Sequence, residues 1–166
     1  GTMSRSACAE NPSGAKGGGA RAEVGEDRHC TDAAARLGRG WKVRPCYRDF
    51  EPGQTLTLAE LKGPGKITHL WFTIAAQDYA YPRSMVLRVY WDGSEEPAVE
   101  SPIGDFFAVG HGLREWVNSR VVEISSGGRA YNCYWPMPFR ESARITVSND
   151  ADVRVNCMYW YIDWLQ

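Results

Sequence analysis

From Trp41 to the end of the chain, apolar residues recur at every second position in short runs separated by turn residues. This spacing is typical of strands, because successive strand side chains point to opposite faces of a sheet, whereas a helix repeats its apolar positions every three or four residues. The pattern predicts an all-β domain. We expect strands at residues 41–47, 54–61, 66–75, 83–91, 120–125, 130–135, 143–149 and 153–165.

The segments between these runs carry residues that suit turns. Gly63-Pro64-Gly65 places a fixed φ angle between two permissive neighbours, Asp92-Gly93 favours the positive φ angles of a tight turn, and Ser126-Gly127-Gly128 is similar. In the run at 66–75, Ile67, His69, Trp71 and Thr73 share one predicted face, while Thr68, Leu70, Phe72 and Ile74 share the other. Both faces are partly apolar, which indicates a central strand.

The first forty residues differ in composition from the rest of the chain. The stretch NPSGAKGGGAR places five glycines in eleven positions, which favours a loop or arm without a core of its own. A short helix is expected from Thr31 or Asp32 as the N-cap through residues 33–37, with Gly38 ending it, and this is the only helix we expect. We therefore divide one overall domain into a glycine-rich arm with a short helix at 1–40 and a β-sandwich at 41–166.

The charge balance excludes several classes of partner. Lys and Arg total 19 against 20 Asp and Glu, for a formal net charge of −1, which provides no field to attract nucleic acid or anionic lipid. No apolar run approaches the roughly 20 residues that span a bilayer, and the N-terminus lacks the features of a secretory signal. We expect no membrane partner, no nucleic-acid partner and a cytoplasmic location.

The cysteines and histidines give no pattern of a metal or cofactor site. The five cysteines are scattered without a Cys-x-x-Cys pair, so we expect free thiols, and His29, His69 and His111 lie far apart in the sequence. The glycine-rich arm has no Gly-Lys-Ser/Thr ending and no third glycine at dinucleotide spacing. We expect no metal and no cofactor.

The segment ESPIGDFFAVGHG contains the best candidate for an acid. Asp105 lies between Gly104 and two phenylalanines, a setting that suits a general acid or a carboxylate that accepts a hydrogen bond from a ligand hydroxyl. Glu100 is a possible companion. The equally weighted alternative is that Asp105 caps a turn through backbone amides.

A second cluster, YNCYWPMPFR, places aromatic residues around two prolines. Aromatic rings with polar edges can bind amphipathic ligands such as sugars, and Asn132 adds a donor and an acceptor. Trp71 and Trp91 could join this surface. The alternative is that about two-thirds of these rings belong to the core, and Arg140 and Arg144 beside them are more often solvated charges.

Several motifs together resemble one known family. NPSGAKGGGAR, LGRGWKVRP, GPGKITHLWFTI, RSMVLRVYWDG, SPIGDFFAVGHG and YNCYWPMPFRESARITVSND occur in an order and wording similar to the N-terminal half of glycoside hydrolase family 172. That family includes difructose dianhydride I synthase/hydrolase and arabinofuranan-degrading enzymes. The similarity extends from about residue 11 to residue 163.

The resemblance implies an antiparallel jelly-roll β-sandwich, normally followed by a second one, in protomers that assemble as trimers or hexamers with active sites near subunit contacts. It implies cleavage or rearrangement of furanosides, of the fructofuranose or arabinofuranose class, with retention through two glutamates and without a metal. Those glutamates belong to the second half, in a Gly-x-Gly-x-Glu-Asp-type motif, and neither is present here.

The catalytic residues therefore stay unassigned, with Asp105 the best candidate for a supporting role. The resemblance implies that the sugar site draws on Trp71, Asp105, Asn132, Trp135 and, in the glycine-rich arm, Lys16 and Arg21. We expect either a furanosidase-like half that acts on or binds carbohydrate, or a non-catalytic jelly-roll module that binds carbohydrate or self-assembles as a homo-oligomer.

Overall fold

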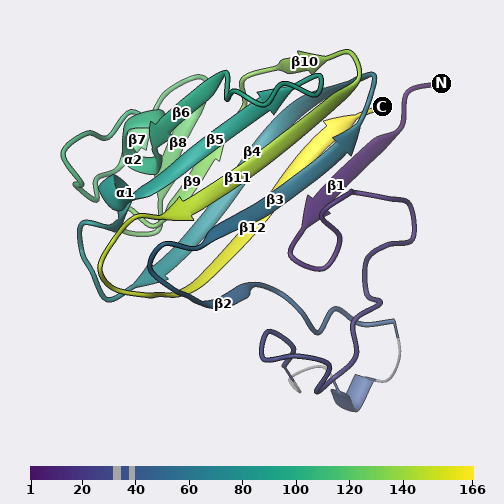
Figure 1. Ribbon diagram of the computed structural model, residues 1–166, viewed down its shortest axis with the longest axis horizontal. Helices are drawn as coiled ribbons and strands as arrows, with labels where there is room; N and C mark the ends of the chain where they lie inside the picture. Colours follow the sequence, from purple (N-terminus) through teal and green to yellow (C-terminus); the bar gives the residue numbers. More distant parts are fainter. Residues whose placement is uncertain (32–34, 38–39) are drawn as a thin grey trace.

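The computed structural model describes residues 1–31, 35–37 and 40–166, which form two antiparallel sheets packed face to face (Figure 1). The larger sheet has the strand order β1-β12-β4-β9-β8-β7, with β10 beside β4 and β2 beside β12. Its strands are β1 (Ser4–Cys8), β2 (Tyr47–Phe50), β4 (Gly65–Ala76), β7 (Val117–Asn118), β8 (Val122–Ser125), β9 (Ala130–Cys133), β10 (Met137–Phe139) and β12 (Val155–Leu165).

The smaller sheet has the order β3-β11-β5-β6. Its strands are β3 (Thr55–Lys62), β5 (Met85–Trp91), β6 (Val99–Pro102) and β11 (Ser142–Asn149). The chain crosses between the sheets from β3 to β4 to β5 and again from β10 to β11 to β12, as a jelly roll requires. The predicted all-β sandwich is confirmed.

The core lies between the two sheets and is closed by apolar side chains from both. Leu58 and Ile145 of the smaller sheet are fully buried, as are Phe72 and Ile162 of the larger one. Trp160 of β12 also donates its indole N–H to the carbonyl oxygen of Leu58, at 2.9 Å. This bond joins the sheets and satisfies the only polar atom of a buried indole.

β4 and β12 form the centre of the larger sheet, as the apolar faces of residues 66–75 predict. Their register contains a bulge, because Asp163 is paired with His69 whereas the next residue, Trp164, is paired with Ile67. The extra residue, Thr68, donates its hydroxyl to the carbonyl oxygen of Asp163. The strict alternation predicted for this strand is therefore wrong at its start: Ile67 is buried in the core, on the face opposite to His69.

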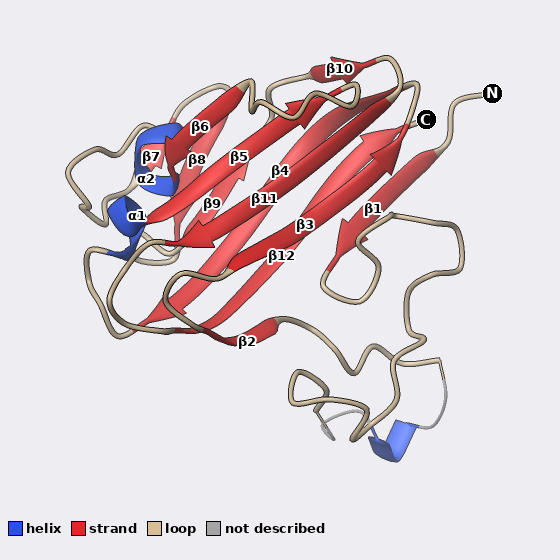
Figure 2. Cartoon of the chain, viewed as in Figure 1, coloured by secondary structure: helices blue, strands red, loops and turns tan. Residues whose placement is uncertain are grey.

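Two short helices, α1 (Tyr81–Ser84) and α2 (Ile103–Phe106), lie together at one end of the sandwich (Figure 2). They correct the expectation of a single helix, since a four-residue turn is too short to show a helical period. Arg83 and Ser84, which the sequence assigned to a strand, belong to α1. In the arm, Ala35–Leu37 form the 3-10 helix η1, and the rest of the helix predicted there lies outside the described residues.

Two predictions about the first fifty residues are wrong. The predicted strand at 41–47 is a loop up to residue 46: Pro45 has no N–H for a ladder, and the carbonyl oxygen of Val43 accepts a hydrogen bond from Thr31. The predicted arm contains the strand β1, whose Ala7 is fully buried. That strand forms because β12 offers it a paired edge, with Ser4 opposite Leu165.

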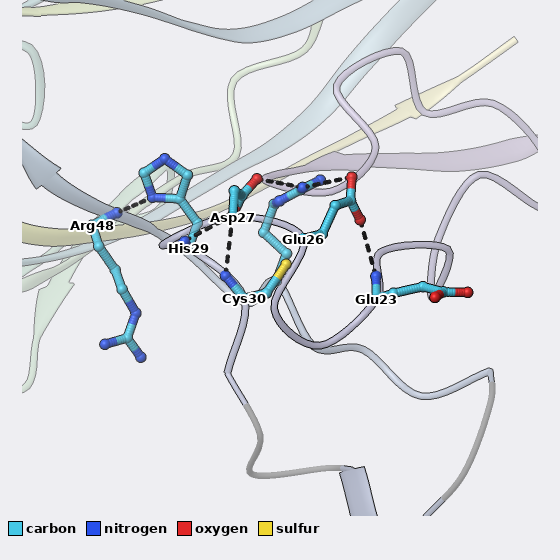
Figure 3. A network of polar contacts seen from close by, with 7 residues as sticks. Glu23, Glu26, Asp27, His29, Cys30 and Arg48 are labelled. Carbon is cyan, nitrogen blue, oxygen red and sulfur yellow. Dashed lines mark hydrogen bonds and ion pairs between the residues drawn. The ribbon is translucent and has the colours of Figure 1, made fainter.

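A polar network holds the arm against β2 (Figure 3). Arg44 forms ion pairs with Glu26 and Asp27. Asp27 accepts hydrogen bonds from the backbone N–H groups of His29 and Cys30, and His29 accepts one from the backbone N–H of Arg48 in β2. The arm is thus tied to the edge of the sandwich by charge-assisted bonds.

Among the described residues, no helix has the length and apolar character needed to cross a membrane.

Candidate functional site

A polar cluster lies on the outer face of the larger sheet, where β4, β9 and β12 run side by side. Nδ1 of His69 lies 3.1 Å from Oδ2 of Asp163, and Nε2 lies 3.1 Å from Oδ1 of Asn132. His69 and Asp163 are direct partners in the β4–β12 ladder, while Asn132 is paired with the neighbouring Trp71. The sheet register alone therefore brings residues from three strands together.

The His69 ring is also held from above. Tyr134, which follows β9, stacks on it with ring centroids 4.6 Å apart and an interplanar angle of 6°. Tyr134 is exposed to solvent, whereas the side chain of His69 is largely covered. His69 is thus fixed in position by a carboxylate, an amide and an aromatic ring.

An aromatic pair continues this surface along the same strands. Trp71 of β4 and Tyr161 of β12 are direct cross-strand partners, with ring centroids 5.5 Å apart. Lys42, from the loop before β2, places its Nζ 2.9 Å from the hydroxyl of Tyr161 and 4.4 Å from the centre of its ring. We call His69, Trp71, Asn132, Tyr134, Tyr161 and Asp163 the β4–β12 face.

The charge on Lys42 is stabilised at this face. Partial burial acts to lower the pKa of Lys42, but the hydrogen bond to Tyr161 and the neighbouring Cys8 thiol outweigh it, so the pKa is raised. The ammonium group therefore remains charged at neutral pH. A cation beside an aromatic ring favours ligands that offer oxygen acceptors.

The arrangement can bind hydroxyl groups but does not contain two converging carboxylates. Both atoms that face the ring are oxygen acceptors, so a neutral His69 donates a hydrogen bond to only one of them, whereas a protonated ring donates to both. The contact to His69 uses Oδ2 of Asp163, and Oδ1 can accept a hydrogen bond from a ligand hydroxyl group. Aromatic faces beside such groups are the usual elements of a sugar-binding surface.

Asp105 lies elsewhere, in α2 at the end of the sandwich. Nη1 of Arg83 lies 3.0 Å from both of its carboxylate oxygens, so the carboxylate pairs with α1. Glu100 instead pairs with Nε of Arg88, at 2.9 Å, within the smaller sheet. Asp105 and Glu100, which the sequence suggests as companions, therefore pair with two different arginines.

The structure brings only some of the predicted site residues together. Trp71 and Asn132 are paired on the β4–β12 face. Trp135 packs edge-on against Phe106 of α2, with ring centroids 5.9 Å apart, and so lies beside the turn that carries Asp105.

Lys16 and Arg21 are in the arm, at the β1 edge of the larger sheet. Arg21 donates its Nε to the carbonyl oxygen of Gly17, and Lys16 lines a small groove with residues of β1. In the strand order, β12 and β4 lie between β1 and the strand of Asn132. Lys16 and Arg21 therefore lie apart from the β4–β12 face.

The sequence reasoning did not assign His69, Tyr161 or Asp163 to the site. The sequence places no ligand partner near His69, and Asp163, which contacts it, is 94 residues away in the chain. The alternation in 66–75 put His69 and Trp71 on one face, which was the available signal. Only the pairing of β4 with β12 shows that Tyr161 and Asp163 lie beside these two residues.

Metal-ligating side chains do not gather in the part of the chain that the structure describes: no three His, Cys, Asp or Glu residues could hold an ion together. The five cysteines are free thiols, as expected. Burial raises the pKa of Cys133, and burial together with the nearby Cys46 raises that of Cys157. These thiols are poorly reactive at neutral pH.

Comparison with known protein families gives one match. A family model described as GH172 domain-like matches residues 42–162, which include every residue of the β4–β12 face except Asp163. No curated protein matches the chain.

Proposed function

The chain belongs to the GH172 domain-like family, and from that premise we propose that it binds furanosides on the β4–β12 face and supplies the sugar-binding half of a glycoside hydrolase. The ligands are of the fructofuranose or arabinofuranose class. The observation that carries the proposal is the juxtaposition of Trp71 and Tyr161 with the hydrogen-bonded group formed by His69, Asn132 and Asp163.

The chemistry of this face fits a small sugar. A furanose ring presents an apolar patch of C–H groups, which can pack on Trp71, and hydroxyl groups around its rim. Asp163 and Asn132 can accept and donate to those hydroxyls, and the Lys42 ammonium can donate to a ring or linkage oxygen. The β4–β12 face is therefore suited to orient a furanoside.

We propose that the chain alone does not cleave the sugar. A retaining glycosidase places two carboxyl groups about 5 to 5.5 Å apart across the bond that breaks. The β4–β12 face contributes one carboxylate, Asp163, and Asp105 is engaged by Arg83 at another part of the fold. The glutamate pair that the resemblance implies is absent from this sequence.

Titration with an arabinofuranose-containing and a fructofuranose-containing oligosaccharide, followed by calorimetry, tests the proposal. We expect saturable binding that Trp71→Ala weakens by up to roughly tenfold, since packing on an aromatic ring contributes on the order of 0.5 to 1.5 kcal/mol. Trp116→Ala is the matched control, because Trp116 is an exposed tryptophan outside the face. Equal losses in the two variants, or no binding to either sugar, would contradict the proposal.

A second candidate function is self-assembly through the same face. Tyr134 and Tyr161 expose 45% and 39% of their surface on one side of a sheet, and aromatic residues are enriched at protein interfaces. We propose that symmetric copies then form a homo-oligomer, a trimer or a hexamer. Light scattering distinguishes the two candidates. A protein that binds the sugars but stays monomeric supports sugar binding and contradicts self-assembly.

A further inference from the structure

A groove of about 670 Å³ lies along β3, the edge strand of the smaller sheet. Its lining combines the ends of β3, β5 and β11 with β1, with Trp164 of β12 and with Ser13 and Ala15 of the arm. The arm is fixed there because the carbonyl oxygen of Pro12 accepts a hydrogen bond from the backbone N–H of Glu60. The groove is thus formed between the sandwich and a bound loop.

A stacked arginine forms part of the groove wall. Arg144 of β11 is directly paired with Glu60 on one side and with Tyr90 on the other. Its guanidinium lies over the Tyr90 ring, 3.7 Å from the ring centre. Stacking of this kind leaves the N–H donors at the rim of the guanidinium available, and these donors match a carboxylate or a phosphate.

Three cationic and two acidic side chains line the groove. Arg5, Lys62 and Arg144 line it together with Glu60 and Glu95, and none of the five forms an ion pair within the described part of the chain. Three unpaired cations in one concave site attract an anion more strongly than isolated surface charges do.

Two buried donors beside the groove also lack an acceptor. Nε of Arg5 and the indole N–H of Trp164 are buried and have no hydrogen-bond partner among the residues that the structure describes, and Trp164 is only 2% exposed. Gly14 has a φ angle of +61°, and a Cβ there would lie 2.8 Å from Nε1 of Trp164, so glycine is what lets the loop approach this closely. The loop's own carbonyl at Gly14 is contacted by Arg5. Unpaired buried donors are costly, and an entering acceptor would satisfy them.

We propose that this groove binds a small organic anion through its carboxylate or phosphate group. The oxyanion lies between Arg144 and Arg5, where it meets donors from both, and displaces the loop slightly to reach the Trp164 indole. Glu60 and Glu95 accept hydrogen bonds from hydroxyl groups on the remainder of the ligand. The site is distinct from the β4–β12 face and does not depend on it.

Nitrogen–proton correlation spectra of the whole chain test the proposal, with the Trp164 indole signal as the reporter. The probes are glucuronate, glucose 6-phosphate and neutral glucose. We expect saturable shifts at millimolar concentration with one or both anions and none with glucose. The anion that shifts the signal identifies the preferred oxyanion. A Trp164 signal that moves with no anion, or moves equally with glucose, overturns the proposal.

Variants separate the groove from general charge effects. Arg144→Ala should weaken anion binding roughly tenfold, since a charge-assisted hydrogen bond contributes more than a neutral one. Arg140→Ala removes the same charge from an exposed position outside the groove and should leave binding unchanged. Trp71→Ala should also leave it unchanged, which keeps failure of this proposal distinguishable from failure of the sugar site. Equal effects of Arg144→Ala and Arg140→Ala would show nonspecific attraction and overturn it.

Discussion

His69 and Asp163 are direct partners across the β4–β12 ladder, and their side chains meet at 3.1 Å on the outer face of the sheet. Asp163 is 41% exposed at its side chain, so solvent screens the pair. Exposed ion pairs contribute at most about 1 kcal/mol to stability. A contact of this kind positions a side chain more than it stabilises the fold.

The first prediction is that Asp163→Asn changes sugar binding more than stability. The thermal midpoint should fall by no more than about 2 to 4 °C, the shift that about 1 kcal/mol gives in a domain of this size. Affinity for the furanoside should fall roughly tenfold, because the acceptor that faces the ligand loses its charge. Circular dichroism and calorimetry measure the two effects. A large loss of stability with unchanged affinity would make the pair structural.

The sequence predicted the strands of the β4–β12 face but not their relation. Seven of the eight predicted ranges contain a strand, because each has its own apolar alternation and turn residues. The bulge at Thr68 leaves no such local pattern, since it arises from how β12 is aligned against β4. The pairing of His69 with Asp163 depends on that alignment, so local sequence could not show it.

The N-terminal errors have a similar physical origin. β1 consists of small and polar residues without a strong strand preference, and it is ordered by an edge that lies more than 150 residues away. In the loop at 41–46 the buried residues Val43 and Cys46 are three positions apart and Trp41 is exposed, so burial there does not follow the two faces of a strand. Apolar spacing alone therefore does not make this segment a strand, because none of the described strands pairs with it.

The second prediction concerns acid stability and Asp92. One carboxylate oxygen accepts hydrogen bonds from three successive backbone N–H groups, those of Arg140, Glu141 and Ser142, at 2.9, 2.8 and 3.2 Å. The bond from Glu141 is the main cause, and together these bonds lower the pKa of Asp92. Because the unfolded pKa is about 3.9, this stabilisation is present above that value and is lost as the pH falls through the lower folded pKa.

Asp92→Asn should therefore be less stable than the natural protein at pH 7, with the difference shrinking as the pH approaches 3. Asparagine keeps an oxygen acceptor and tolerates the φ angle of +53° at this position, so the turn itself persists. Urea unfolding across this pH range measures the effect, and the exposed Asp152→Asn controls for the loss of one carboxylate. A difference that stays constant with pH would contradict the assignment.

The third prediction is that Arg44 holds the arm. The pKa of Glu26 is lowered mainly by the hydrogen bond from the backbone N–H of Glu23, and the ion pair with Arg44 lowers it further. Burial acts to raise the pKa of Asp27, but the interactions with Arg44 and the hydrogen bond from the backbone N–H of His29 outweigh it, so this pKa is lowered too. Arg44→Met should speed amide hydrogen exchange at His29 and Cys30 by up to about fivefold, the effect of about 1 kcal/mol.

Arg48→Met is the matched control for the arm. The Arg48 backbone N–H bonds to His29, but its guanidinium points away from the network (Figure 3). Exchange at His29 and Cys30 should therefore stay unchanged in that variant. Faster exchange in Arg48→Met alone would assign the hold on the arm to β2 and not to Arg44.

The last prediction concerns two tyrosines in the core near the helices. The hydroxyl groups of Tyr81 and Tyr131 hydrogen-bond to each other at 3.0 Å, and both residues are 1% exposed. Burial is the main cause that raises the pKa of each phenol, so both are neutral at ordinary pH. Removing one hydroxyl leaves the other buried without this partner, at a cost of about 1 to 3 kcal/mol.

Tyr81→Phe and Tyr131→Phe should each lower the free energy of unfolding by that amount, while the double variant should lose clearly less than the sum. Once both hydroxyls are gone, no unpaired donor remains, and each phenyl ring keeps its packing. A double-mutant cycle by urea unfolding measures the coupling. Tyr79→Phe, at an exposed position, should change stability by less than about 0.5 kcal/mol. Additive losses would mean that each hydroxyl is satisfied independently of the other.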